Sequence, residues 1–263
     1  FDAVEASSEF RLINLAVTQT IDEHPQDKLA IEHFVVNRPY GCCIDRGSKV
    51  TIVSPSSLVD PCTGYFSYYI ALIGGFNYIS REIGELRPYR SYYAFDDRNT
   101  HEENLALYME DLEKLTSREG SWTLTILAAS GALEPAYPTM FHFSAGGAKG
   151  DECFEGDNLI VRDMVAYRAF YENLSEELKT NFDMDSDHQR YHSVTSSKMF
   201  ARKFNEGLGC KNNIVLRVAW SACLWDSRRI AIAQTIAEAL VRHFDAETPK
   251  AYLEDLKIKK CGY

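Results

Sequence analysis

The stretch Asn213–Phe244, NIVLRVAWSACLWDSRRIAIAQTIAEALVRHF, decides how the rest of the chain is interpreted. It opens with an apolar run rich in β-branched residues, Ile214–Val218, which is typical of a buried strand. The small residues Ser221–Cys223 follow, and helical spacing of apolar residues then extends from about Asp226 to His243. This pattern predicts a strand and a helix joined at Cys223. It would place that thiol at the carboxyl edge of a sheet, where sites gather in α/β proteins.

Strand and helix patterns alternate over the second half of the chain, from Trp122 onward. Such alternation favours an α/β fold with a mixed, partly parallel sheet flanked by helices. No repeat or low-complexity linker divides the chain, so we expect a single domain over residues 1–263. If the chain is subdivided, the tyrosine-rich loop Arg87–Arg98 is the place.

The remaining elements are predicted from hydrophobic period and from turn residues. Strands are expected at Phe10–Ile21, Leu29–Val36, Lys49–Val53, Trp122–Ala128, Thr139–Phe143 and Asn158–Val161, and a turn at Arg38–Gly41. Helices are expected at Tyr65–Ile83, where Gly74 and Gly75 could break the helix, after Thr100, and at Val165–Phe182 and Thr195–Leu208.

Composition excludes several classes of function. The 263 residues carry a formal net charge of −10, which argues against a nucleic-acid binder. The longest apolar run, Tyr65–Phe76, is too short to span a bilayer. Seven cysteines without a CxxC pair argue against a zinc ribbon and favour a reducing compartment. Because no N-terminal signal pattern is visible, we expect a cytoplasmic location or delivery into a host cytosol.

Cys223 and His142 are the first candidates for catalysis. A thiolate is the reactive form of cysteine, and a helix N-terminus or an imidazolium close by lowers a thiol pKa. His142 lies in a short strand that leads into the loop Ser144–Gly150, so it could serve as the base. The amides of Gly146 and Gly147 in that loop could stabilise an oxyanion. The alternative is that both Cys223 and His142 are packing residues.

The segments TMFHFSAGG and NIVLRVAWSAC resemble the two signature strands of the caspase-like cysteine peptidases, including the toxin self-processing and CHAT branches. The resemblance covers roughly the C-terminal half of the chain. It implies an apolar strand ending in a His-Gly pair and a second strand ending in the nucleophilic Cys223. This chain has Gly146-Gly147 where the family has His-Gly, and His142 lies four positions earlier. Either the base is shifted, or the chain is an inactive relative, or the likeness is coincidental.

Cys62 is the rival nucleophile. It lies at the predicted N-terminus of the aromatic helix, an arrangement similar to that of papain-like and transglutaminase-like enzymes. His142 would again be the base, and Asp157 or Asp163 would orient it. Both arrangements predict a hydrolase of the thiol class, either a peptidase or an acyl-transferase.

The expected substrate of such an enzyme is a protein or peptide, and no cofactor or metal is expected. The spacing Asp183-x-Asp185-x-Asp187 resembles the start of a calcium loop, but position six is His188 and position twelve is Val194. An exposed acidic loop is therefore predicted there. A non-catalytic interaction module on a degenerate hydrolase fold is the hypothesis from another class, and oligomeric state is left open.

Overall fold

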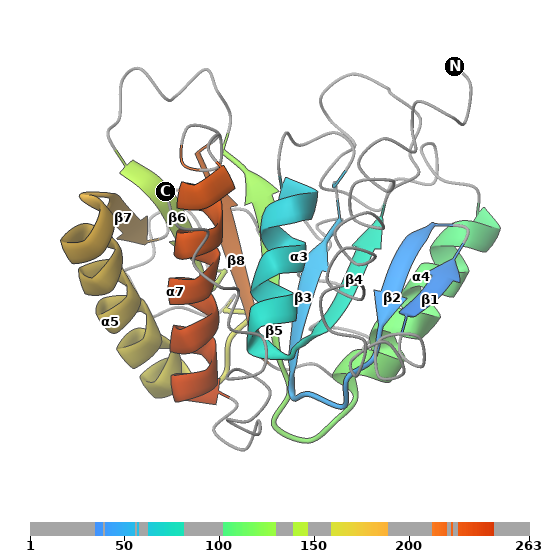
Figure 1. The fold of residues 1–263 in the computed structure, drawn as a ribbon. Coiled ribbons are helices and arrows are strands. Elements are labelled where there is room, and N and C mark those ends of the chain that lie inside the picture. The colour runs from blue at the N-terminus through green and yellow to red at the C-terminus, as the bar shows by residue number, and fades with distance from the viewer. Residues whose placement is uncertain are drawn as a thin grey trace.

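The computed structural model describes residues 35–38, 40–55, 57, 63–81, 102–129, 139–146, 159–188, 212–219, 222 and 226–244. These residues form an eight-stranded mixed sheet of order β1-β2-β4-β3-β5-β8-β6-β7, with helices on both faces (Figure 1). The α/β fold expected from the sequence is confirmed. The strands are β1 (Val35–Arg38), β2 (Gly41–Ile44), β3 (Val50–Ser54), β4 (Asn77–Arg81), β5 (Trp122–Ala128), β6 (Thr139–Ser144), β7 (Asp185–His188) and β8 (Asn212–Val218).

Parallel pairing occupies the middle of the sheet. Strand β3 pairs in parallel with both β4 and β5, and β5 pairs in parallel with β8. Toward one edge, β1, β2 and β4 pair antiparallel. Toward the other edge, β6 runs antiparallel to β8 and parallel to β7. The carboxyl ends of β3, β5 and β8 therefore meet at one edge of the sheet.

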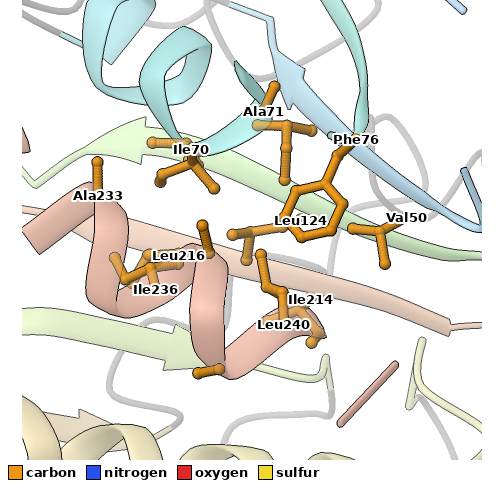
Figure 2. Packing of buried hydrophobic residues seen from close by; sticks show 14 of the residues in the cluster. Val50, Ile70, Ala71, Phe76, Leu124, Ile214, Leu216, Ala233, Ile236 and Leu240 are labelled. Atoms are coloured by element: carbon orange, nitrogen blue, oxygen red, sulfur yellow. The ribbon is translucent and has the colours of Figure 1, made fainter. Parts of the chain in front are cut away.

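Three helices cover one face of the sheet and α4 (Glu102–Thr116) covers part of the other (Figure 1). The first face carries α3 (Thr63–Gly74), α5 (Met164–Phe182) and α7 (Asp226–Phe244). Figure 2 shows Ile70 of α3 and Ile236 of α7 meeting Leu124 and Leu216 of the sheet. Each such side chain stabilises the fold by roughly 1.5–3 kcal/mol when it leaves water.

The second face buries a separate cluster under α4. Tyr108, Leu112 and Leu115 of that helix pack on Val53 and Ile79, which alternate with residues of the first face. Because neighbouring side chains of a strand point to opposite faces, β3 and β4 supply both clusters.

The aromatic helix predicted over Tyr65–Ile83 is shorter than expected. Helix α3 ends at Gly74, and Gly75 adopts φ +66°. The N–H of Phe76 donates to the carbonyl of Ala71 at 2.9 Å and that of Gly75 to Leu72 at 3.3 Å, which together form a Schellman C-cap. The chain then enters β4, which the prediction had merged into the helix.

Besides β4, strands β2 and β7 do not match any predicted strand. Strand β2 follows the turn at Arg38–Gly41, which is confirmed by the pairing of Arg38 with Gly41. Strand β7 lies where an acidic loop was expected. A strand was predicted at Asn158–Val161, but the structure has isolated β-bridges there, at Leu159 and Val161. The strand Phe10–Ile21 and the helix Thr195–Leu208 lie outside the described residues, and β1 overlaps only the end of Leu29–Val36.

Within the part of the chain that the structure describes, no helix is both long and apolar enough to cross a bilayer.

Candidate functional site at the carboxyl edge of the sheet

One row of side chains crosses the sheet at the carboxyl ends of β5 and β8. Leu127 of β5 is in register with Arg217 of β8, Arg217 with His142 of β6, and His142 with Asp187 of β7. Side chains in register across neighbouring strands lie on the same face. The row therefore presents a cation, an imidazole and a carboxylate side by side at the edge where ligands of α/β proteins bind.

This row faces away from α5 and α7. Phe141 and Phe143, the neighbours of His142 in β6, belong to the core on the α5 side, where Phe143 meets the ring of Phe170. Alternation along the strand therefore turns His142 to the opposite face. Leu127 of the same row packs there with Val215 and Ile160.

His142 and Asp187 are in close hydrogen-bonding contact. The distance from His142 Nδ1 to Asp187 Oδ1 is 2.8 Å. The His142 side chain is 5% exposed and that of Asp187 is 27% exposed. An ionised carboxylate accepts hydrogen bonds, so this contact assigns the proton of the neutral ring to Nδ1 and the lone pair to Nε2. A histidine oriented in this way is suited to take a proton at Nε2.

Arg217 is the cation of the row. It interrupts the otherwise buried run of β8 and is half-buried. One row further into the sheet, on the same face, Thr125 of β5 is in register with Val215 of β8. Within the described part of the chain, the Thr125 hydroxyl makes no hydrogen bond, although the residue is only 2% exposed.

His188, the next residue of β7, lies on the α5 face. Its ring is 5.4 Å from that of Tyr167 and 5.2 Å from that of Tyr171, measured between centroids. Burial lowers the pKa of His188 to about 4, against a smaller opposing effect of the Asp187 charge. The two histidines of this region thus differ in role, and His142 alone belongs to the row.

Of the residues predicted for catalysis, the structure places His142 and Gly146. The N–H of Gly146 donates to Ser144 Oγ at 3.2 Å, so that amide takes part in the turn after β6. Asp163, the alternative orienting carboxylate, caps α5 by accepting from the N–H of Ala166 at 3.0 Å. Cys223, Cys62, Asp157 and Gly147 lie outside the described residues.

The described cysteines are Cys42 and Cys43 of β2, both free and buried. Four strands separate β2 from β6 in the sheet. Burial raises the pKa of the Cys43 thiol to about 11, with a further contribution from the charge of Asp111. Neither thiol belongs to the site of His142.

Sequence reasoning missed Asp187 and Arg217. The sequence predicts an acidic loop at Asp187, because four polar residues in a row carry no strand signal. Its pairing with His142 depends on parallel strands 45 residues apart in the chain. Arg217 left a signal, since it is the single charge within an apolar strand.

No family model and no curated protein matches the sequence. The solved structures that are similar in fold include a metallo-carboxypeptidase and an amidase. The metallo-carboxypeptidase is from Burkholderia cenocepacia, with 12% identity and a TM-score of 0.45 over 76% of this chain and 57% of that one. This chain thus spans little more than half of the carboxypeptidase chain. The amidase is the catalytic domain of CwlV, an N-acetylmuramoyl-L-alanine amidase from Bacillus (Paenibacillus) polymyxa var. colistinus, with 12% identity and a TM-score of 0.37 over 74% of this chain and 98% of that one.

The prediction of a thiolate-dependent hydrolase is corrected by these findings. Neither similar structure is named as a thiol enzyme. Among the described residues, a carboxylate on β7 and an arginine on β8 flank His142 in register, whereas the described cysteines lie on β2. The oxyanion role of Gly146 and Gly147 stays a prediction, because Gly147 lies outside the described residues. The caspase-like resemblance stays a prediction.

A metal site needs several ligating side chains placed around one point. His142 with Asp187 resembles the carboxylate–histidine pair that often supports a ligated metal. However, the described residues contain no group of three or more His, Cys, Asp or Glu side chains placed to hold an ion. They assign no metal ligands.

Proposed function

We propose that the chain is a hydrolase in which His142, held by Asp187, acts as the general base that activates water. The observation that carries this proposal is the 2.8 Å contact between His142 Nδ1 and Asp187 Oδ1 at the carboxyl edge of the sheet. Carboxylate-supported imidazole is a common form of general base, and a general base typically contributes 10²–10⁴-fold to a rate.

The reaction would proceed through two proton transfers at one atom. Nε2 of His142 accepts a proton from a water molecule as the water oxygen bonds to the electrophilic carbon or phosphorus of the substrate. The imidazolium that forms is stabilised by the ionised Asp187. Nε2 then returns the proton to the leaving group as the scissile bond breaks. The water molecule supplies the oxygen and the hydrogen added to one product and the proton added to the leaving group, so the reaction needs no other reactant.

A second function, ligand binding without turnover, is favoured by one observation. The His142 side chain is only 5% exposed, which leaves a small area through which a substrate can reach it. In this case the row would bind a ligand but would not activate water.

A rate comparison between two histidine variants tests the proposal. The wild-type chain is assayed against chromogenic esters, peptide amides and phosphate esters, so that the protein or peptide substrate predicted from the sequence is one class of the panel. His142→Gln should lower kcat/KM by about 10²–10⁴-fold on the substrate that turns over. His243→Gln is the matched control, because His243 lies on α7 beside Asn173 of α5.

Equal rates in wild type and His142→Gln would contradict the general base. The absence of turnover across the panel, with a ligand still bound in the row, would favour the second function. Circular dichroism of each variant shows whether the fold is kept.

A further inference from the structure

We propose that the row at the carboxyl edge recognises an anionic group, a carboxylate or a phosphate, through Arg217 with help from the hydroxyl of Thr125. This inference names the substrate class of the proposed hydrolase and so rests on that function. It concerns binding, however, and can be tested without turnover.

The position of Arg217 carries the first step. Arg217 is in register with His142, and residues directly opposite across strands have Cβ atoms about 5 Å apart. A group held by its guanidinium would therefore lie beside the imidazole. Guanidinium groups bind carboxylate and phosphate through two parallel hydrogen bonds, which fixes the orientation of the bound group.

The environment of Arg217 carries the second step. Apart from this residue, β8 presents buried side chains from Asn213 to Val218. Asp187 Oδ1 contacts His142 Nδ1 at 2.8 Å, and His142 lies between Asp187 and Arg217 in the register of the row. A half-buried cation is screened less by salt than an exposed one, so its attraction for an anion is stronger.

Thr125 carries the third step. It is a diagonal neighbour of Arg217, one row inward on the same face. Its hydroxyl is buried and makes no hydrogen bond within the described residues. Leaving such a group unsatisfied costs about 1–3 kcal/mol, and an anion oxygen held by Arg217 would accept from it.

Titration with simple anions tests the inference. Uniformly ¹⁵N-labelled chain is titrated at low ionic strength with inorganic phosphate and, separately, with acetate, and the amide signals of Thr125 and Leu127 are followed with the ring signals of His142. We expect saturable shifts with at least one anion, and the two titrations distinguish a phosphate ligand from a carboxylate ligand. Arg217→Gln should weaken binding at least tenfold, whereas Arg217→Lys should retain part of it.

Two further variants complete the design. Thr125→Val removes the hydroxyl with little change of shape and should weaken binding several-fold. Arg168→Gln is the control and should bind as wild type does, because Arg168 lies on the exposed side of α5 paired with Glu172. If Arg217→Gln binds as tightly as wild type, or if neither anion shifts the wild-type signals, the inference is overturned.

The hydrolase proposal and the anion-binding inference can be contradicted independently of each other. A chain that binds phosphate or acetate through Arg217 but hydrolyses nothing supports this inference and contradicts the hydrolase. In that case His142→Gln should bind the anion within a fewfold of wild type, because the positive charge of Arg217 is kept.

Discussion

At the residue scale, His142 and His188 are separated by a sheet although they lie on adjacent strands. His142 shares a face with Asp187 and Arg217. His188 lies between the rings of Tyr167 and Tyr171 on the other face, where burial lowers its pKa to about 4. The folded state therefore disfavours a charge on His188, and the unfolded state accepts one at an ordinary pKa of about 6.5.

This difference predicts that acid weakens the fold through His188. Between pH 6.5 and pH 4 the unfolded chain binds more protons at this site than the folded chain, so stability falls as pH falls through that window. On moving from pH 7 to pH 5, wild type should lose about 1 kcal/mol more of its free energy of unfolding than His188→Gln, a figure reduced for partial exposure of the ring. Urea unfolding at both pH values measures the difference. Equal losses in the two proteins would show that His188 is not the group responsible.

The sequence singled out His142 but gave no indication of Asp187 or Arg217 as its neighbours. A histidine in a short strand before a glycine-bearing loop is visible in the chain itself. The residues beside His142 are determined by strand order. Asp187 reaches it through strand pairing across 45 residues of the chain. Arg217 reaches it because β6 pairs antiparallel with β8. No local pattern encodes either contact.

At the element scale, α5 shows how a polar residue defines a helix start. Asp163 precedes the helix, and its side chain accepts from the N–H of Ala166 at 3.0 Å. Helix N-termini leave four N–H groups without intrahelical partners, and a carboxylate there also interacts favourably with the helix dipole. The sequence suggested Asp163 as an alternative orienting carboxylate for catalysis. In the structure, the Asp163 side chain caps α5.

Removing this cap should weaken the fold without affecting the site. Asp163→Ala should lower the free energy of unfolding by about 1 kcal/mol, because it leaves the N–H of Ala166 without its acceptor. Asp163→Ser should recover most of that loss, since serine is also a good N-cap. Urea unfolding measures both variants. The hydrolysis rate of the folded protein should be the same in both variants as in wild type. A loss of turnover in a folded Asp163→Ala would instead support a catalytic role for Asp163.

Helix boundaries were less predictable than helix positions. The aromatic period of α3 is clear, yet the same apolar character continues into β4, so one long helix was predicted. The break depends on Gly75 at φ +66°, a conformation that glycine adopts without a steric penalty. The Gly74-Gly75 pair indicates a possible break, but the sequence NYISR of β4 has no polar-apolar alternation that would identify a strand.

At the scale of the whole molecule, contacts between distant segments join the sheet to α4. Asp111 of α4 accepts from Arg38 Nη2 at 2.8 Å and from the Tyr40 hydroxyl at 2.6 Å. Burial, followed by the hydrogen bond to Asp111, raises the pKa of Tyr40, which keeps the phenol protonated as a donor. Asp111 is 5% exposed, so these contacts lie largely out of water.

Asp111→Asn should therefore be strongly destabilising. Loss of the buried charge weakens both hydrogen bonds, and bonds to charged groups contribute about 1.5–3 kcal/mol each, so a decrease of roughly 2–3 kcal/mol is expected in urea unfolding. Asp45→Asn is the matched control. Asp45 also pairs with an arginine, Arg118 at 2.8 Å, but both side chains are about one third exposed, and the loss should stay within about 1 kcal/mol. Similar losses in the two variants would contradict the assignment of the network as a buried one.

The class of fold could be predicted from the sequence, and its sheet order could not. Period and length identified β3, β5, β6, β8, α5 and α7 within a few residues. The sheet order places β8 between β5 and β6, and Figure 1 shows α7 beside α3 on the face that they cover. No pattern in the chain reports this order. For the same reason the sequence could indicate the carboxyl edge as a site but could not say which side chains meet there.

The most direct test of the central claim is a double-mutant cycle on His142 and Asp187. Hydrolysis of the substrate identified in the panel is measured for wild type, His142→Gln, Asp187→Asn and the double variant. If Asp187 acts by orienting and stabilising His142, each single change lowers kcat by about 10²-fold or more, and the double variant is no slower than His142→Gln. Losses that multiply in the double variant, or a wild-type rate in His142→Gln, would contradict the account.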